Sequence, residues 1–157
     1  MDVLVHAEFG TFDKLRSECS RLHDCPFDLA AASFDPGAGI WRGVFVRPVD
    51  DPARFVKQRI FLLLTRHYFP LLETVVTLRG VEDVLVQDRA GIGTYTFNNV
   101  QRIPSGCRFV FNEDLEIDVT FQDQPRGEFR DERELSDRRG YVTSLGFVDF
   151  GIRLEAA

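Results

Sequence analysis

Three residues with metal-binding or nucleophilic side chains lie close together early in the chain. Cys19, His23 and Cys25 form a C-x3-H-x-C cluster. Thiolate and imidazole groups are zinc ligands, and a closed structural site needs four ligands. The spacing matches no standard zinc motif, and Cys19 also falls on the apolar stripe of an expected helix, where a buried free cysteine is common. We therefore predict no metal site and no cofactor.

A cysteine nucleophile would need a histidine base and a third group that orients this base. The histidines of the chain are His6, His23 and His67. His67 falls on an apolar stripe, where we expect a core histidine, and His6 falls on the outer face of the first expected strand. We assign no catalytic residue. A non-enzymatic function is favoured, although an enzyme with a site that no motif reveals stays an alternative.

The common catalytic and nucleotide-binding motifs are absent from the sequence. There is no G-x-S-x-G, no Walker sequence and no H-E-x-x-H. Gly91-Ile92-Gly93 resembles part of a phosphate-binding loop, but a strand follows it rather than a helix. No helix N-terminus would receive a phosphate there, so we interpret these residues as a hairpin turn.

A row of carboxylates alternates with apolar residues in the stretch DLEIDVTFQ. Asp114, Glu116 and Asp118 share one face of an expected strand. Side chains two residues apart on a strand lie roughly 7 Å apart, too far for one ion to bind all three without other ligands. We interpret the row as the solvated face of a strand. We also predict that these three residues contact a protein partner with a basic surface.

Acidic residues are concentrated in the second half of the chain. The chain has 25 acidic and 19 basic residues and a net charge of -6, which argues against a nucleic-acid binder or a binder of anionic membranes. Residues 113–137 contain ten acidic residues and three arginines, a net charge of -7 that leaves +1 for the remainder. Such an asymmetry would steer a basic partner toward the acidic region.

Length and cysteine content indicate one domain in a reducing compartment. The 157 residues predict a single compact domain over residues 1–157, with an α+β half at 1–79 and a β-rich half at 80–157. Three cysteines without a C-x-x-C pair, and no apparent signal peptide, favour reduced thiols in the cytoplasm. The longest apolar run, residues 60–64, is too short to span a membrane.

The first half contains two expected helices. Thr11 would cap the first helix, whose stripe is Phe12, Leu15, Cys19 and Leu22. Asp51-Pro52 would start the second helix, which we expect to continue to Pro70. Strands are expected at residues 1–9, 40–49 and 73–79, while residues 26–34 fit a strand or a helix. This order of elements is that of a ferredoxin-like fold if residues 26–34 form a strand.

The second half is expected to be all β. Residues 81–87 form one strand, and residues 94–122 form a three-stranded antiparallel meander with Leu115, Ile117, Val119 and Phe121 on its apolar face. Residues 124–140 are polar and charged, so we expect a mobile loop or a loose hairpin. Strand character returns at 141–155, where Gly146 is a plausible bulge. The predicted fold class is α+β: a mostly antiparallel sheet covered by two main helices.

Three function classes are compatible with these features. We favour a small non-catalytic protein-interaction or partner-neutralising module with an acidic face. The first alternative is a small-molecule binder with a pocket between helices and sheet. The second is an enzyme whose site is scattered along the sequence. An exposed edge strand would also allow two copies to pair as a homodimer.

Overall fold

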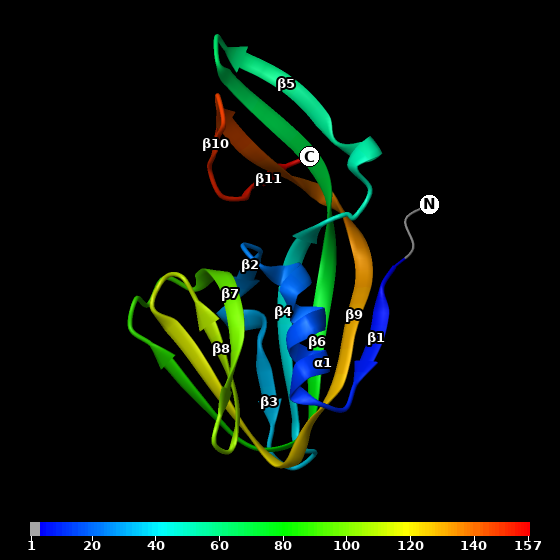
Figure 1. The fold of residues 1–157 in the computed structure, drawn as a ribbon, viewed down its shortest axis with the longest axis vertical. Helices are drawn as coiled ribbons and strands as arrows, with labels where there is room; N and C mark the ends of the chain where they lie inside the picture. Colours follow the sequence, from blue (N-terminus) through cyan, green and yellow to red (C-terminus); the bar gives the residue numbers. More distant parts are fainter. Residues whose placement is uncertain (1–3) are drawn as a thin grey trace.

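The computed structural model describes residues 4–157 and is mostly β-sheet (Figure 1). Within these residues α1 (Phe12–Cys19) is the only α-helix, and the 3-10 turn η1 (Ser20–Leu22) prolongs it. Two further 3-10 turns are η2 (Leu29–Ala31) and η3 (Pro52–Arg54). The strands are β1 (His6–Phe9), β2 (Pro26–Asp28), β3 (Ser33–Asp35), β4 (Ile40–Pro48), β5 (Val56–Phe61), β6 (Leu64–Asp88), β7 (Thr94–Ile103), β8 (Gly106–Phe111), β9 (Leu115–Leu145), β10 (Val148–Asp149) and β11 (Arg153–Ala156).

Six strands close into an antiparallel barrel. The hydrogen-bonded order is β9, β8, β7, β2, β4 and β6, and β6 pairs back onto β9. Strands β6 and β9 form one long two-stranded ribbon that bends near Gly80, where the pairing register shifts. Closure leaves the interior lined by alternate residues of each strand, as in other small barrels.

The barrel interior is the main hydrophobic core. The apolar face predicted for the meander is confirmed, because Leu115, Ile117 and Val119 are fully buried and Phe121 is nearly so. They pack with aromatic residues from the other strands, and Trp41 and Phe109 have ring centres 5.0 Å apart. The core draws on both halves of the chain.

The first expected helix is confirmed. The hydroxyl of Thr11 accepts a hydrogen bond from the Lys14 amide at 3.2 Å, which satisfies one of the unpaired donors at the start of α1. The predicted stripe of Phe12, Leu15 and Cys19 is buried against the core. Helix α1 packs on β7 and β9.

The second expected helix is wrong, and with it the α+β class with two main helices. Asp51 caps only the short turn η3, where its carboxylate accepts from the Ala53 amide. The chain then becomes extended and forms β5 and the start of β6. Phenylalanine, valine, isoleucine, threonine and tyrosine are frequent in the segment and favour extended structure, which outweighed the helical spacing. The ferredoxin-like order fails for the same reason.

The expected loop at residues 124–140 is also wrong, because it forms the middle of β9. Its buried residues Phe129, Asp131 and Leu135 are separated by charged residues that face solvent. The high charge therefore belongs to the outer face of a strand paired with β6. Residues 26–34 divide between β2, η2 and β3. Residues 1–3 of the first expected strand lie outside the described residues.

Beyond the barrel, the β6–β9 ribbon continues into a second sheet, which we call the extension and define as residues 54–69 and 138–157. It projects from the barrel at the top of Figure 1 and adds β5, β10 and β11 to the ribbon. A small separate core of Phe69, Leu71 and Leu135 lies where the extension meets the barrel. The extension thus has little interior of its own.

Candidate functional site

The carboxylate row lies on the outer face of β9 and is ion-paired. Arg108 on β8 forms a bidentate pair with Asp118, at 2.6 and 2.8 Å, and lies 3.3 Å from Glu116. Arg89 pairs with Asp114 at 2.9 Å. The hydrogen bonds that Arg108 donates to Asp118 raise the pKa of Arg108, which favours its charged form. Each predicted contact residue therefore has a cation beside it within the same chain.

The cysteines and histidines do not combine into a site. Cys19, Cys25 and Cys107 are buried free thiols, and burial raises the pKa of Cys25 and Cys107 to about 12, so neither is an activated nucleophile. His23 hydrogen-bonds the Asn98 carbonyl at 2.8 Å and is exposed. In the described part of the chain, no group of three or more His, Cys, Asp or Glu residues could hold a metal ion.

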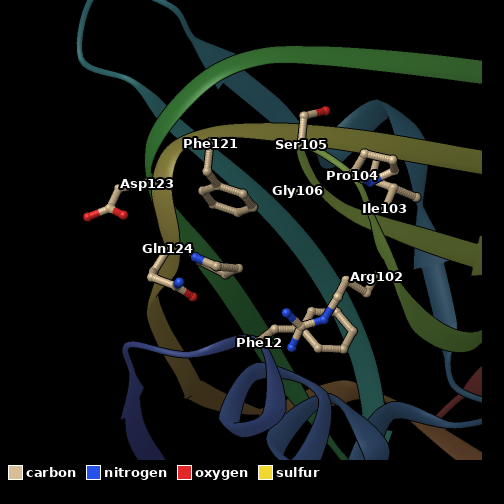
Figure 2. A pocket seen from close by; sticks show the side chains of 10 residues that line it. Phe12, Arg102, Ile103, Pro104, Ser105, Gly106, Phe121, Asp123 and Gln124 are labelled. Carbon is tan, nitrogen blue, oxygen red and sulfur yellow. The ribbon is translucent and has the colours of Figure 1, made fainter.

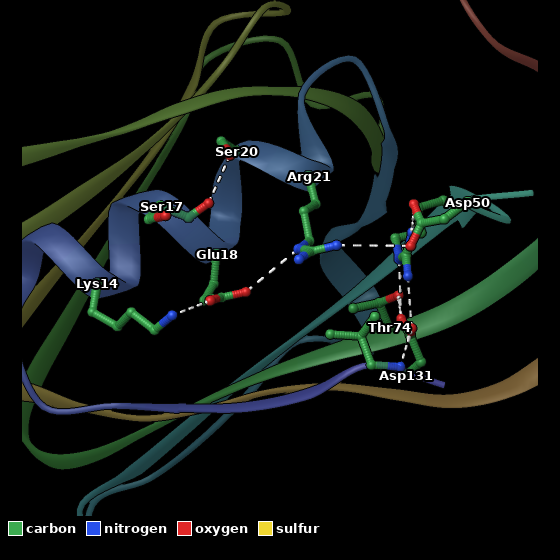
Figure 3. A network of polar contacts seen from close by, with 10 residues as sticks. Lys14, Ser17, Glu18, Ser20, Arg21, Asp50, Thr74 and Asp131 are labelled. Carbon is green, nitrogen blue, oxygen red and sulfur yellow. Dashed lines mark hydrogen bonds and ion pairs between the residues drawn. The ribbon is translucent and has the colours of Figure 1, made fainter. Parts of the chain in front are cut away.

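One buried ion pair lies beneath the barrel surface, and Figure 3 shows its surroundings. The Arg47 guanidinium donates to Asp131 at 2.7 and 3.0 Å, and the Thr74 hydroxyl donates to the same carboxylate at 2.7 Å. The Val5 amide completes the set at 2.8 Å. Arg47 also donates to the exposed Asp50 at 2.8 Å. Internal donors saturate the Asp131 carboxylate, so the network joins the residue before β1 to β4, β6 and β9 and has no vacant position for a ligand on Asp131.

A cavity of about 460 Å³ opens at the end of the barrel that is remote from the extension. Figure 2 shows its lining, which comes from the start of α1, the β7–β8 hairpin and the bend of β9. Phe121 and Pro125 form an apolar floor, the Arg102 guanidinium lies 4.6 Å from the ring centre of Phe12, and Asp123 and Gln124 lie at the exposed rim. Ser105 is the only hydroxyl among these described residues, and the lining contains no histidine or cysteine. The cavity can therefore hold an apolar group but lacks a nucleophile with its base.

The most unusual surface is at the far end of the extension. We call it the apolar tip, and it consists of two adjacent hairpin loops with their flanking residues. Phe147 is 100% exposed, and Leu62 and Leu63 are 71% and 70% exposed. The members of the apolar tip are Phe61, Leu62, Leu63, Leu145, Phe147 and Val148. Soluble proteins seldom expose so many large apolar side chains together.

The two loops are held in a defined position relative to each other. Leu64 pairs with Leu145 across the β6–β9 ribbon, and the Gly146 amide donates to the Leu63 carbonyl at 3.2 Å. Each loop has two residues, and Gly146 has a φ of 63°, which suits the first position of such a hairpin. Leu62 occupies that position in the other loop with a φ of 29°. A leucine with positive φ is strained, and such strain is concentrated at functional sites.

Basic and aromatic side chains line the extension between the apolar tip and the barrel. The Arg66 guanidinium lies 4.7 Å from the ring centre of Tyr141, and that of Arg139 lies 4.0 Å from the ring centre of Tyr68. These cation–π contacts stiffen one face of the extension. Lys57 and Arg59 lie on the edge strand β5 and are exposed.

Charge divides between the two parts of the molecule. The extension has seven basic and two acidic residues, a net charge of +5, whereas the other residues have twelve basic and twenty-three acidic ones, a net charge of -11. Along the sequence, the excess negative charge lies in residues 113–137, and the remaining residues are nearly neutral. The three-dimensional division is stronger, because it joins two basic segments that are distant in sequence.

Sequence reasoning missed the apolar tip because the expected second helix placed Ile60, Leu63 and Leu64 on its buried stripe and so left no exposed apolar cluster to notice. The run Ile60-Phe61-Leu62-Leu63-Leu64 was the available signal: as a strand–turn–strand, it must place some of these side chains in solvent. The bulge expected at Gly146 is wrong, because this glycine forms the second loop.

Comparisons with protein-family models, with curated proteins and with solved structures find no match to this chain. Among residues 4–157, no helix has the length and apolar character that crossing a membrane requires. Function must therefore be inferred from the geometry of the chain itself.

Proposed function

We propose that this protein is a non-catalytic protein-interaction module of the cytoplasm whose main contact surface is the apolar tip. The exposure of Phe61, Leu62, Leu63 and Phe147 on two hydrogen-bonded hairpins carries the proposal. Transfer of one such side chain from water to an interface contributes about 1.5–3 kcal/mol. A partner that covers the apolar tip would recover this free energy.

The surroundings of the apolar tip fit the anatomy of a protein interface. Interfaces have a compact apolar and aromatic centre and a polar rim that excludes water. Here Phe147 and Leu62 form the centre, while Lys57 and Arg59 supply charged rim groups. The loops are ordered by backbone hydrogen bonds, so little conformational entropy would be lost on binding.

A protein suits this surface better than a nucleic acid or a membrane. Arg66 and Arg139 lie over tyrosine rings, which limits their reach toward phosphates. The net charge of -11 on the rest of the molecule would be repelled by a polyanion or an anionic bilayer. The three buried free thiols support a reducing compartment.

Affinity capture from native lysate tests the proposal. We expect the double variant Phe147→Ser/Leu62→Ser to lose the proteins that the wild type captures. The matched control is Ile92→Ser/Leu85→Ser, which removes two exposed apolar side chains from the barrel instead. The triple variant Asp114→Asn/Glu116→Gln/Asp118→Asn tests the carboxylate row. Retention of every partner by the tip variant would show that the apolar tip is not the contact surface.

A further inference from the structure

We propose that the apolar tip of one copy docks into the cavity at the opposite end of a second copy, so that the protein assembles head to tail. This inference rests on the proposed function, since it uses the same contact surface and names its partner. In Figure 1 the β5–β6 loop lies at the top of the long axis, whereas the β7–β8 hairpin and the bend of β9 lie at the bottom. Each copy thus presents both halves of the interface at opposite ends.

Charge complementarity selects a second copy in this orientation. The extension carries +5 and the rest of the chain -11, so the extension of one copy is attracted to the barrel of another. Two extensions in contact would instead bring two sets of uncompensated basic groups together. Symmetric pairing of β5 edges would place Lys57 and Arg59 near their own counterparts, and like charges across strands are destabilising.

The charged groups next to each surface are free to pair across the interface. Within residues 4–157, Arg59 next to the apolar tip and Lys57 farther along β5 make no ion pair, and Asp123 at the cavity rim makes none either. Glu82 and Asp83, which flank the bend opposite Phe121, are also exposed and unpaired there. Docking would therefore satisfy charges that the single chain leaves in solvent.

The cavity has the shape and chemistry to receive an aromatic anchor. Its volume of about 460 Å³ is within the range of about 300–1,000 Å³ for binding pockets. Its floor contains the ring of Phe121, with which an incoming Phe147 ring could stack, and the Arg102 guanidinium over Phe12 offers a cationic face to the same ring. An aromatic anchor in a desolvated pocket, with charges at the rim, is the usual form of an interface hot spot.

Such an interface is heterologous, because two different surfaces meet. Heterologous contacts close into rings or propagate as open filaments, according to the rotation between neighbours. One consequence is decisive: a copy without its apolar tip and a copy without its cavity can still form one complete interface between them.

Sedimentation velocity over a wide concentration range tests the inference with this complementation. The tip variant is Phe147→Ser, and the cavity variant is Asp123→Lys/Gln124→Trp, which reverses the rim charge and covers the cavity. We expect the wild type to associate with rising concentration and each variant alone to be monomeric. An equimolar mixture of the two variants should form a one-to-one complex that grows no further. The controls Ile92→Ser and Glu8→Lys should associate like the wild type.

Salt supplies a second readout. Because Lys57 and Arg59 face acidic groups in the proposed interface, the association constant of the wild type should fall at least severalfold from low to high ionic strength. Association that strengthens with salt would contradict the charge argument.

Three results would overturn the inference. They are a wild type that stays monomeric at every concentration, a cavity variant that self-associates as well as the wild type, and a variant mixture that stays monomeric. In these cases the apolar tip can still be required for capture of a different protein. The proposed function then stands, and only a second copy of the chain is excluded as the partner of the apolar tip. Tip-dependent binding to anionic lipid vesicles by a monomeric wild type, without captured protein, would overturn both.

Discussion

Asp131 shows how a charged side chain is buried in this barrel without becoming a binding site. Burial pushes its pKa up, but hydrogen bonds from Arg47, Thr74 and the Val5 amide outweigh burial and hold the pKa below its usual value. A carboxylate that accepts several bonds is stabilised in its charged form. The role of Asp131 is therefore to hold β4, β6 and β9 together with the segment that leads into β1.

Replacing Asp131 with asparagine should destabilise the fold by about 3 kcal/mol, because the buried Arg47 would lose its buried counter-charge and keep only its ion pair with the exposed Asp50. Urea denaturation measures the loss. The double variant Arg47→Met/Asp131→Leu is the control, since it removes both charges and should recover much of the stability. A loss under about 1 kcal/mol for Asp131→Asn would show that water or another group compensates Arg47.

The same carboxylate predicts a pH dependence. The pKa of Asp131 is lower in the folded state than the value of about 3.9 expected for the unfolded chain. Its contribution is therefore complete above about pH 5 and is lost as the pH falls through the folded-state pKa. In a pH series of urea denaturations, the free energy of unfolding of wild type should fall more steeply in acid than that of Asp131→Asn.

Leu62 is a residue whose replacement should weaken binding without lowering the stability of the fold. Its φ of 29° costs a leucine free energy that glycine would not lose. We expect Leu62→Gly to leave the melting temperature unchanged or to raise it by about 2–4 °C, as measured by calorimetry. The same change should weaken partner capture. A clear fall in melting temperature would mean that the leucine side chain stabilises the isolated fold.

At the residue scale, the alternation of apolar and polar residues predicted which side chains are buried, but it could not predict which charged side chains form ion pairs. The inward positions of residues 115–121 could be identified because a strand with one dry face has a two-residue period. The partner of Asp118 could not be identified, because Arg108 faces it only once the β8–β9 register is known. The carboxylate row therefore looked free in the sequence, whereas Arg89 and Arg108 form ion pairs with it in the fold.

The long strands β6 and β9 are the elements on which the architecture depends. Both strands run through the barrel and continue into the extension. The pairing register between them shifts near Phe69 and again near Gly80, where the ribbon bends. Gly127 lies against the backbone of Thr77 in this ribbon, so closely that an added Cβ would collide with the Thr77 carbonyl. Backbone atoms cannot move aside as a flexible side chain would.

Gly127→Ala should therefore destabilise the protein by about 3 kcal/mol or more, at the upper end of overpacking effects. Chemical denaturation measures this, with Gly151→Ala as the control because nothing lies within 4 Å of a Cβ built at Gly151. Equal stability of the two variants would show that β6 and β9 are not in the close contact described.

At the element scale, two errors had physical causes that the sequence does not resolve. Asp51-Pro52 is a genuine capping signal, but the structure uses it for a single 3-10 turn. In residues 124–140, charge suggested a loop because its neutralisation across strands, as between Glu73 and Arg133, depends on tertiary pairing. By contrast, the first helix was predictable because its cap and apolar stripe are both local.

For the whole molecule, the separation of a basic extension from an acidic barrel is the feature with most functional weight. It could not be predicted from the sequence, because residues 54–69 and 138–157 become neighbours only through the pairing of β6 with β9. Barrel closure is hidden for the same reason, since it joins strands far apart along the chain. Composition indicated a compact fold but not which apolar residues would stay outside it.

The most direct test of the apolar tip as contact surface is site-specific photo-crosslinking in the protein's native cells. A photoreactive phenylalanine analogue would replace Phe147, with Ile92 and Glu116 as comparison positions on the barrel. We predict that position 147 crosslinks strongly to protein, whereas position 92, which is also exposed to solvent, does not. Crosslinks at position 116 together with none at position 147 would contradict the account and return the contact surface to the carboxylate row.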